Sequence, residues 1–96
     1  MNASKPVGVI ECGTKGVSSL VHKTALNKVI SKIYVLKSED SRQYGIHFPN
    51  AEIVDKKELI LQDSDIDHVI IYEPASEHMH LVAEVLKTGK KVQIIS

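Results

Sequence analysis

The chain has 96 residues, of which 43% are hydrophobic and 25% are charged, with 12 basic and 12 acidic side chains. This size and composition are typical of one small globular domain, and a net charge of zero gives no support to a nucleic-acid or membrane-surface partner. No apolar run approaches the roughly 20 residues of a membrane span, and the N-terminus lacks the apolar core of a signal peptide. The single cysteine, Cys12, excludes an intrachain disulfide, so we expect a cytoplasmic protein.

The first predicted element is a buried strand from Lys5 to Cys12, which leads into a turn containing Gly13 and Gly16. A strand, a glycine turn and a helix open a dinucleotide-binding unit, in which G-x-G-x-x-G brings a pyrophosphate to the helix N-terminus. Gly13 and Gly16 occupy the second and third glycine positions, and Glu11 occupies the first. The pattern therefore predicts a nucleotide-binding turn that consists of Glu11, Cys12, Gly13, Thr14, Lys15 and Gly16.

A helix follows this turn, and a second strand follows the helix. The helix is predicted from Lys15 to Lys28, because five residues fall on one helical face: Val17, Leu20, Val21, Thr24 and Ala25. The second strand, from Lys32 to Lys37, is almost continuously apolar, as in parallel sheets that are covered on both faces. The polar stretch from Ser38 to Gly45 is expected to be a loop or at most one helical turn.

A short third strand is predicted from Ala51 to Val54, followed by a short helix. Asp55 has the character of an N-cap residue for this helix, and Glu58, three residues further on, completes a capping box. The buried side of the helix is expected to consist of Leu59, Ile60 and Leu61.

The last third of the chain predicts a strand, a helix and a final strand. The fourth strand runs from His68 to Glu73, Ser76 caps the next helix, and Gly89 ends it as a C′ glycine. The buried stripe of this helix is predicted to be Met79, Val82, Ala83 and Leu86, and the fifth strand contains Val92, Ile94 and Ile95. The alternation predicts an α/β fold: a doubly wound, parallel five-stranded sheet in the order 3-2-1-4-5, Rossmann-like, with helices on both faces.

Three stretches of the chain resemble the N-terminal nucleotide-binding domain of the glucose–fructose oxidoreductase / inositol dehydrogenase (Gfo/Idh/MocA) family. Residues 7–16, Val-Gly-Val-Ile-Glu-Cys-Gly-Thr-Lys-Gly, are similar to the family's apolar strand and G-C-G-x-x-G turn. Residues 57–71 are similar to its E-L-L followed by D-I-D-x-V-x-I. Pro74 with His78, then residues 83–92, resemble its P-x-x-x-H helix and its A-L-x-x-G-K-x-V ending. The three stretches occur in the family's order and spacing over nearly the whole chain.

The resemblance implies an NAD(P)-binding domain of an oxidoreductase, with Glu73, Pro74 and His78 among the cofactor-binding residues and His78 beside the nicotinamide ribose; Pro74 is also expected to shape the end of the fourth strand. The family's last strand continues into Glu-Lys-Pro, whose lysine is catalytic, whereas Ile95 and Ser96 stand at the aligned positions here. The family also has a second, substrate-binding domain, which these 96 residues do not contain. Because hydride transfer needs a general acid or base at the substrate, we assign no catalytic residue and do not expect dehydrogenase activity from this chain alone.

Two positions bear on the choice of cofactor. A carboxylate at Glu11, about 5 Å from a phosphate charge, would cost roughly 3 kcal/mol at an effective dielectric constant near 20, and Lys15 could offset part of it. An NAD site normally has an acidic residue after the second strand, but Lys37 and Ser38 stand there, with Arg42 further on. If a cofactor binds, these residues favour NADP. Glu39 and Asp40 keep NAD possible, and the charges are also compatible with a solvated loop.

The cysteine and the histidines can be explained by packing and helix formation as well as by functional roles. Cys12 lies where a helix dipole could lower the pKa of its thiol, whereas the family resemblance gives it a packing role. The five histidines (His22, His47, His68, His78 and His80) form no metal motif, because no cysteine or carboxylate cluster completes a site. His78 either lines the cofactor cleft or helps to start its helix.

The sequence therefore leaves several functions open. The leading hypothesis is a stand-alone module that binds NADP, NAD or a related nucleotide. The alternatives are a degenerate domain that acts as an interaction or oligomerisation unit, with the edge of its last strand favouring self-association, and the cofactor half of a split oxidoreductase. The related CoA-binding Rossmann domain also fits the glycines.

Overall fold

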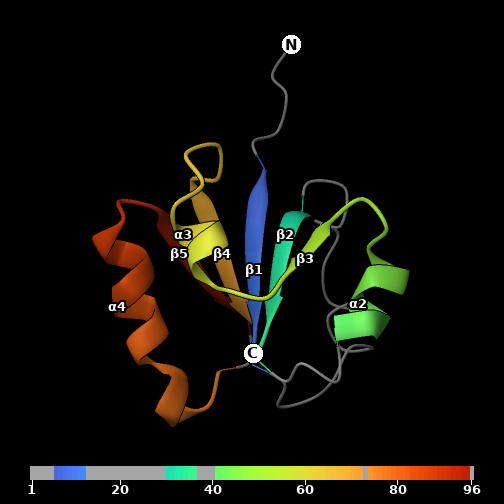
Figure 1. The fold of residues 1–96 in the computed structure, drawn as a ribbon. Helices are drawn as coiled ribbons and strands as arrows, with labels where there is room; N and C mark the ends of the chain where they lie inside the picture. The colour runs from blue at the N-terminus through green and yellow to red at the C-terminus, as the bar shows by residue number, and fades with distance from the viewer. Residues whose placement is uncertain (1–5, 13–29, 37–40, 73, 96) are drawn as a thin grey trace.

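The protein has an α/β fold built on one open, parallel sheet. The computed structural model describes residues 6–12, 30–36, 41–72 and 74–95 (Figure 1). All five strands of the sheet are parallel, and their order is β3-β2-β1-β4-β5, which confirms the predicted fold class and strand order. The strands are β1 (Val7–Glu11), β2 (Ile30–Val35), β3 (Glu52–Val54), β4 (His68–Tyr72) and β5 (Lys91–Ile95).

Helices cover both faces of this sheet, as predicted. On one face, the α2 face, α2 (Ser41–His47) packs through Tyr44 onto a buried cluster that also contains Val9, Ile33 and Ile70. On the other, the α4 face, α3 (Glu58–Leu61) and α4 (His80–Lys87) cover a second cluster, and the 3-10 helix η3 (Ser76–His78) leads into α4. Among the described residues, no helix is both long enough and apolar enough to cross a membrane.

The first two strands lie close to their predicted positions. β1 ends at Glu11, one residue before the predicted end. β2 begins at Ile30, two residues earlier than predicted, because Ile30 is buried and pairs with Val7 at the start of the ladder. The helix predicted from Lys15 to Lys28 lies outside the described residues, as does Lys37.

The polar stretch after β2 forms more structure than predicted. We expected a loop or a single turn, but α2 is a helix of seven residues. Its Tyr44 is fully buried and stacks on Phe48, with ring centroids 6.3 Å apart. The prediction was wrong because these two aromatic side chains pack onto the sheet, and burial against distant strands outweighs the polar local composition.

The helix α3 is also different in detail. Its N-cap is Lys57, without a side-chain hydrogen bond, so the predicted capping box of Asp55 and Glu58 is wrong. Only Ile60 of its three apolar residues is fully buried, whereas Leu59 is exposed and Leu61 is half-buried. Ile60 lies directly over Gly8 of β1, where a Cβ atom would stand 2.5 Å from its Cγ2 atom. The missing side chain of Gly8 therefore lets α3 pack closely on the centre of the sheet.

The predicted buried stripe of α4 is wrong. Leu81 and Val85 are the buried residues, and Val82 is half-buried. The predicted core residues Met79, Ala83 and Leu86 are exposed. Ser76 does not cap α4 either: it begins η3, and the N-cap of α4 is Met79, which makes no side-chain cap.

At the other end of α4, Gly89 has a φ angle of +84°, so the predicted C′ glycine is confirmed. The next residue, Lys90, donates hydrogen bonds from Nζ to the carbonyl oxygens of Asp63 and Ile66 in the loop before β4. Asp63 in turn accepts a hydrogen bond of 2.8 Å from Nζ of Lys32 in β2. We call Lys32, Asp63 and Lys90 the amino-end clamp, because they join three segments at the edge where β4 and β5 begin.

Charge pairing within the clamp shifts two of its pKa values. The hydrogen bond between the side chains raises the pKa of Lys32 and is the largest cause of the lowered pKa of Asp63. The backbone N–H of Asp65 also donates to Asp63, which lowers the pKa of that carboxyl further. The clamp therefore holds both groups in their charged forms.

Candidate functional site at the carboxyl ends of the strands

The edge opposite the amino-end clamp is where an open α/β sheet binds its ligands. Such ligands lie beyond the carboxyl ends of the strands, at the point where the winding of the chain changes direction. In this sheet β1 lies between β2 and β4, so the change of direction falls between β1 and β4. In Figure 1 this edge is at the bottom, opposite the end at which the chain enters β1. We call it the carboxyl-end edge; its described residues are Glu11, Cys12, Leu36, Tyr72 and residues 74–78.

Glu11 is the last residue of β1 and is fully buried, with 0% of its surface exposed. It pairs with Val35 of β2 and Tyr72 of β4, and its carbonyl oxygen accepts a hydrogen bond of 2.9 Å from the N–H of Leu36. Strand alternation places its Cβ atom on the α2 face with the other odd-numbered residues of β1. The strand therefore continues through the first-glycine position, and the side chain there belongs to the interior of the edge.

Cys12 is buried on the opposite face, among the apolar residues under α3 and α4. Its N–H donates a hydrogen bond of 3.3 Å to the carbonyl oxygen of Tyr72, which ties the residue after β1 to the end of β4. Burial, and to a smaller extent the negative charge of Glu11, together raise the pKa of the Cys12 thiol to about 11. The thiol is therefore protonated at neutral pH, which favours the packing role over a reactive nucleophile.

The segment after β4 is ordered by His78. Its Nδ1 atom accepts a hydrogen bond of 2.9 Å from the N–H of Ala75, which closes the turn that follows Pro74. In a neutral imidazole with an accepting Nδ1 atom, the proton lies on Nε2, which leaves a donor for a second partner. The contact matches the expectation that His78 helps to start its helix, and it leaves the expectation that His78 lines a cofactor cleft as a prediction.

His80 makes a separate set of contacts. Its Nδ1 atom lies 3.1 Å from the carbonyl oxygen of Glu77, and its Nε2 atom lies 3.9 Å from Oε1 of Glu84. His78 and His80 thus have different partners. Within the part of the chain that the structure describes, no three histidine, cysteine or acidic residues gather into a group that could hold a metal ion.

Of the predicted cofactor-binding residues, the structure places Glu11, Cys12, Pro74 and His78 at the carboxyl-end edge of β1 and β4. The others lie outside the described residues: Gly13, Thr14, Lys15, Gly16, Lys37, Ser38 and Glu73. The sequence analysis did not single out Tyr72, which is fully buried and pairs directly with Glu11. A tyrosine next to the end of the predicted fourth strand, His68 to Glu73, was the signal that could have revealed it.

The topology and this edge together define a Rossmann-like fold, and known structures have the same fold. No family model matches the chain, and no curated protein matches its sequence. Among solved structures, yvaA of Bacillus subtilis, a protein classed as an oxidoreductase, superimposes on 96% of the chain with a TM-score of 0.73 and 29% sequence identity.

Two further structures extend this likeness to proteins that are described with a cofactor. The 3-ketoreductase KijD10 of Actinomadura kijaniata, solved with NADP and TDP-benzene, gives a TM-score of 0.71 over 96% of the chain at 22% identity. A protein of Desulfitobacterium hafniense, classed as an NADPH-dependent oxidoreductase, gives 0.72 over 96% at 23% identity. The matched part is 27%, 29% and 27% of the yvaA, KijD10 and D. hafniense chains, so this chain spans less than a third of their length. At these identities the likeness shows a common fold.

Proposed function

We propose that this chain is an NAD(P)-binding module related to the Gfo/Idh/MocA oxidoreductases. One observation carries the proposal: the 3-2-1-4-5 sheet superimposes over 96% of the chain on oxidoreductases, one of which was solved with NADP. The family resemblance of the glycine turn, the D-I-D stretch and the P-x-x-x-H helix supports the same assignment. The dinucleotide is assigned to the carboxyl-end edge between β1 and β4.

The described residues fit a dinucleotide in the layout of their backbone. The hydrogen bonds of Glu11 to Leu36 and of Cys12 to Tyr72 fix the start of the turn to the strands on both sides. In the proposal, the N–H groups of residues 13–16 hold the pyrophosphate, as the G-x-G-x-x-G pattern predicts. Lys37 and Ser38 contact the adenosine ribose and favour NADP, and Glu73, Pro74 and His78 lie toward the nicotinamide.

The side chain of Glu11 is unfavourable for a bound pyrophosphate and lowers the expected affinity for a dinucleotide. In its charged form, it raises the pKa of Cys12 by electrostatic repulsion, and the same charge repels a pyrophosphate. Its complete burial within the edge keeps the carboxylate from the surface but removes it from the screening of bulk water. We therefore expect the wild type to bind a dinucleotide more weakly than a variant that has glycine at this position.

The module binds and orients the cofactor and does not complete a reaction. A bound nicotinamide would supply the hydride acceptor or donor, whereas the proton of the substrate hydroxyl needs a general acid or base. We assign that group to a second domain or to a separate chain, as in a split oxidoreductase. NADP binding without turnover of a polyol substrate is the expected behaviour of these 96 residues.

Titration calorimetry with NADP, NAD, ADP-ribose and CoA tests the proposal. The wild type is compared with Glu11→Gly, which restores the first glycine, and with Glu11→Gln, which removes only the charge. Glu52→Gln is the matched control, because Glu52 is an exposed carboxylate on the edge strand β3, which β2 separates from β1. If repulsion costs roughly 3 kcal/mol, Glu11→Gly should tighten NADP binding by about two orders of magnitude.

The pattern of binding separates the alternatives. Tight NADP binding by Glu11→Gly with unchanged Glu52→Gln supports the proposed edge, and a similar gain in Glu11→Gln identifies the charge as the obstacle. Tighter binding of CoA than of NADP would indicate a CoA-binding Rossmann domain instead. Absence of binding in all four folded proteins would contradict the nucleotide module and leave the interaction unit as the function.

A further inference from the structure

The helix α4 has apolar residues on two sides. Leu81 and Val85 face the sheet and are buried. Met79 and Leu86, together with Ala83, form a second apolar row, and the first two are 45% and 55% exposed. We call Met79, Ala83 and Leu86 the outer row. An exposed row with helical spacing is an unpartnered packing surface within the described residues.

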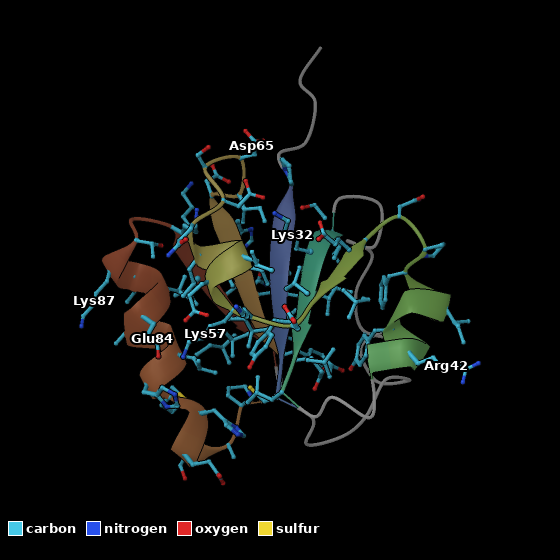
Figure 2. All side chains as sticks on the ribbon, viewed as in Figure 1. Lys32, Arg42, Lys57, Asp65, Glu84 and Lys87 are labelled. Carbon is cyan, nitrogen blue, oxygen red and sulfur yellow. The ribbon has the colours of Figure 1, made fainter. Side chains whose placement is uncertain are left out.

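An ion pair shows in which direction the outer row points. Nζ of Lys57, the residue before α3, lies 2.9 Å from a carboxylate oxygen of Glu84. Figure 2 shows Lys57 approaching Glu84 from the α3 side, while Lys87 extends away from the molecule. At 100° per residue, Leu86 lies about 160° from Glu84 around the helix. Leu86 therefore lies on the side of α4 away from α3, which is the side of the β5 edge, whereas Ala83, about 180° from the midpoint of Leu81 and Val85, points away from the sheet.

That flank ends in the edge strand β5. Among the described strands, β5 has a neighbour only on its β4 side. The N–H of Lys91 donates to the carbonyl oxygen of Asp67 next to β4, so the backbone groups of Lys91, Gln93 and Ile95 face β4. The N–H and C=O groups of Val92 and Ile94 therefore face outward. Ile94 is 42% exposed as well.

The two edge strands of the sheet differ in their protection. β3 has three residues, one of which is the exposed, charged Glu52. β5 has five residues, Lys-Val-Gln-Ile-Ile, and its only charge is at its first position. Short strands and charged side chains protect natural edges from pairing, and β5 lacks this protection beyond Lys91.

We propose that the outer row and the edge of β5 form one surface that binds a second copy of this chain. The two β5 strands pair in antiparallel orientation about a two-fold axis at Gln93. In this register, Val92 of each copy lies opposite Ile94 of the other, and the outward backbone groups of both residues form four N–H···O=C bonds. The pairing is self-complementary, which is what a two-fold dimer requires.

The same two-fold axis brings the helices together. It keeps both α4 helices on one face of the combined sheet, side by side and antiparallel, with Leu86 of each outer row on the facing side and Met79 next to it. Val92 and Ile94 lie on this face as well, so each copy adds apolar side chains beneath the helix pair. Glu77, exposed before α4, then lies at the end where the other copy has its exposed Lys87 and Lys91. A net charge of zero adds no long-range repulsion between the copies.

Sedimentation velocity over a range of concentrations tests the dimer. Two five-residue strands and two short helices form a small interface compared with the about 800 Å² per partner of typical stable complexes, so we expect micromolar association. Leu86→Glu and Ile94→Lys should each weaken it by about tenfold or more. Ile46→Glu is the matched control: Ile46 is 70% exposed, but it lies on α2 at the opposite face, so this variant should associate like the wild type.

Disulfide trapping tests the register. At a two-fold axis through a non-hydrogen-bonded pair, two Gln93→Cys residues would have Cα atoms about 4.5 Å apart, within the range for a disulfide. Lys91→Cys exposes a thiol on the same strand and face but lies opposite Ile95, so it should not cross-link to itself. Cys12, being buried, does not compete.

Rapid, concentration-dependent cross-linking of Gln93→Cys without that of Lys91→Cys supports the proposed pairing. A chain that remains monomeric at several hundred micromolar would overturn it. So would a dimer that Leu86→Glu and Ile94→Lys do not weaken, while circular dichroism shows that both variants are folded. These readouts do not depend on nucleotide binding, so the dimer and the proposed function can fail separately.

Discussion

The two ends of the sheet are held together in different ways. At the amino end, charged side chains reach across to other segments: Lys90 donates to two backbone carbonyl oxygens of the loop before β4, and Lys32 donates to the side-chain carboxylate of Asp63. At the carboxyl end, the described contacts run mainly through the backbone, from Leu36 to Glu11 and from Cys12 to Tyr72, with buried side chains between them. Side-chain hydrogen bonds therefore join the segments at the amino end, whereas backbone hydrogen bonds between neighbouring strands hold the candidate site at the carboxyl end.

This difference separates the motifs of the family resemblance into those at the amino end and those at the carboxyl end. Residues 65–71 and 89–92 resemble family motifs, and in the structure they meet at the amino end, where Lys90 binds the carbonyl oxygen of the buried Ile66. Gly89 makes the backbone turn that brings Lys90 there. These motifs therefore indicate the fold. In the proposed function, only the glycine turn and the segment after β4 contact the ligand.

The largest expected effect concerns close packing at the amino end of β1. Replacing Gly8 with alanine places a Cβ atom against the buried Ile60, and relieving this overlap should cost about 2–3 kcal/mol. Thermal unfolding should then occur roughly 10–20 °C lower. Gly45→Ala is the matched control, because its new Cβ atom would lie at an ordinary contact distance, 3.8 Å from Ile53. The substitution also removes a glycine from a helix, so the variant should be as stable as the wild type or slightly more stable. Equal melting temperatures for the two variants would show that α3 does not pack closely on β1.

The next effect concerns the buried thiol at the carboxyl end. With its pKa near 11, Cys12 should react with iodoacetamide at pH 8 about two orders of magnitude more slowly in the folded protein than in urea. The folded chain keeps the thiol neutral while the unfolded chain ionises it, so this group stabilises the fold below the thiol's unfolded pKa and loses that contribution as pH rises toward 11. Glu11→Gln should speed the labelling by removing the nearby charge. Labelling at the rate of an exposed thiol would show that this edge is open.

A smaller effect is expected at the amino-end clamp. Lys90→Met keeps the length of the side chain but removes the donor to two carbonyl oxygens, which should cost about 2 kcal/mol in urea unfolding. Lys87→Met, at an exposed position on α4, removes the same charge and should change stability by less than about 0.5 kcal/mol. If both variants cost the same, the contacts of Lys90 contribute little to stability.

The smallest effect is the pH dependence of the Lys32–Asp63 pair. The folded pKa of Asp63 lies below its ordinary value of 3.8, so its contribution is complete above that value and is lost as pH falls through the folded pKa. Asp63→Asn should therefore cost about 1 kcal/mol at pH 7, as is usual for a partly exposed ion pair. At pH 2 the difference from the wild type should nearly disappear. A difference that is constant with pH would assign the effect to the amide rather than to the charge.

The sequence predicted the topology because alternating apolar strands and helices leave few arrangements for a parallel sheet. It could not predict which side of α4 is buried, since Met79, Ala83 and Leu86 have the same helical spacing as Leu81 and Val85. The burial of Leu81 and Val85 against the sheet and the ion pair between Lys57 and Glu84 show how the helix is rotated, and both are contacts between residues distant in sequence. Likewise, α2 depends on the burial of Tyr44 against strands far away in the chain.

For the candidate site, the sequence pattern identified which residues to consider, but it did not show the surroundings of their side chains. The glycine pattern identified Glu11 and Cys12, and the structure places both at the carboxyl-end edge. The strand from Lys5 to Cys12 was predicted to be buried as a whole, but its sequence does not show which face of the sheet each residue enters, so the position of Glu11 on the α2 face could not be predicted. The partnership with Tyr72 depends on the register between β1 and β4, which the sequence does not specify.

The contact between Lys57 and Glu84 has a consequence for how the protein folds. A helix with two apolar rows can settle on a sheet in either of two rotational settings, and both bury hydrophobic side chains. Turning α4 so that the outer row faces the sheet would carry Glu84 away from Lys57, so the pair stabilises only one setting. A contribution of about 0.5–1 kcal/mol from such a pair favours that setting by roughly two- to fivefold. This salt bridge thus selects between two packings more than it strengthens either.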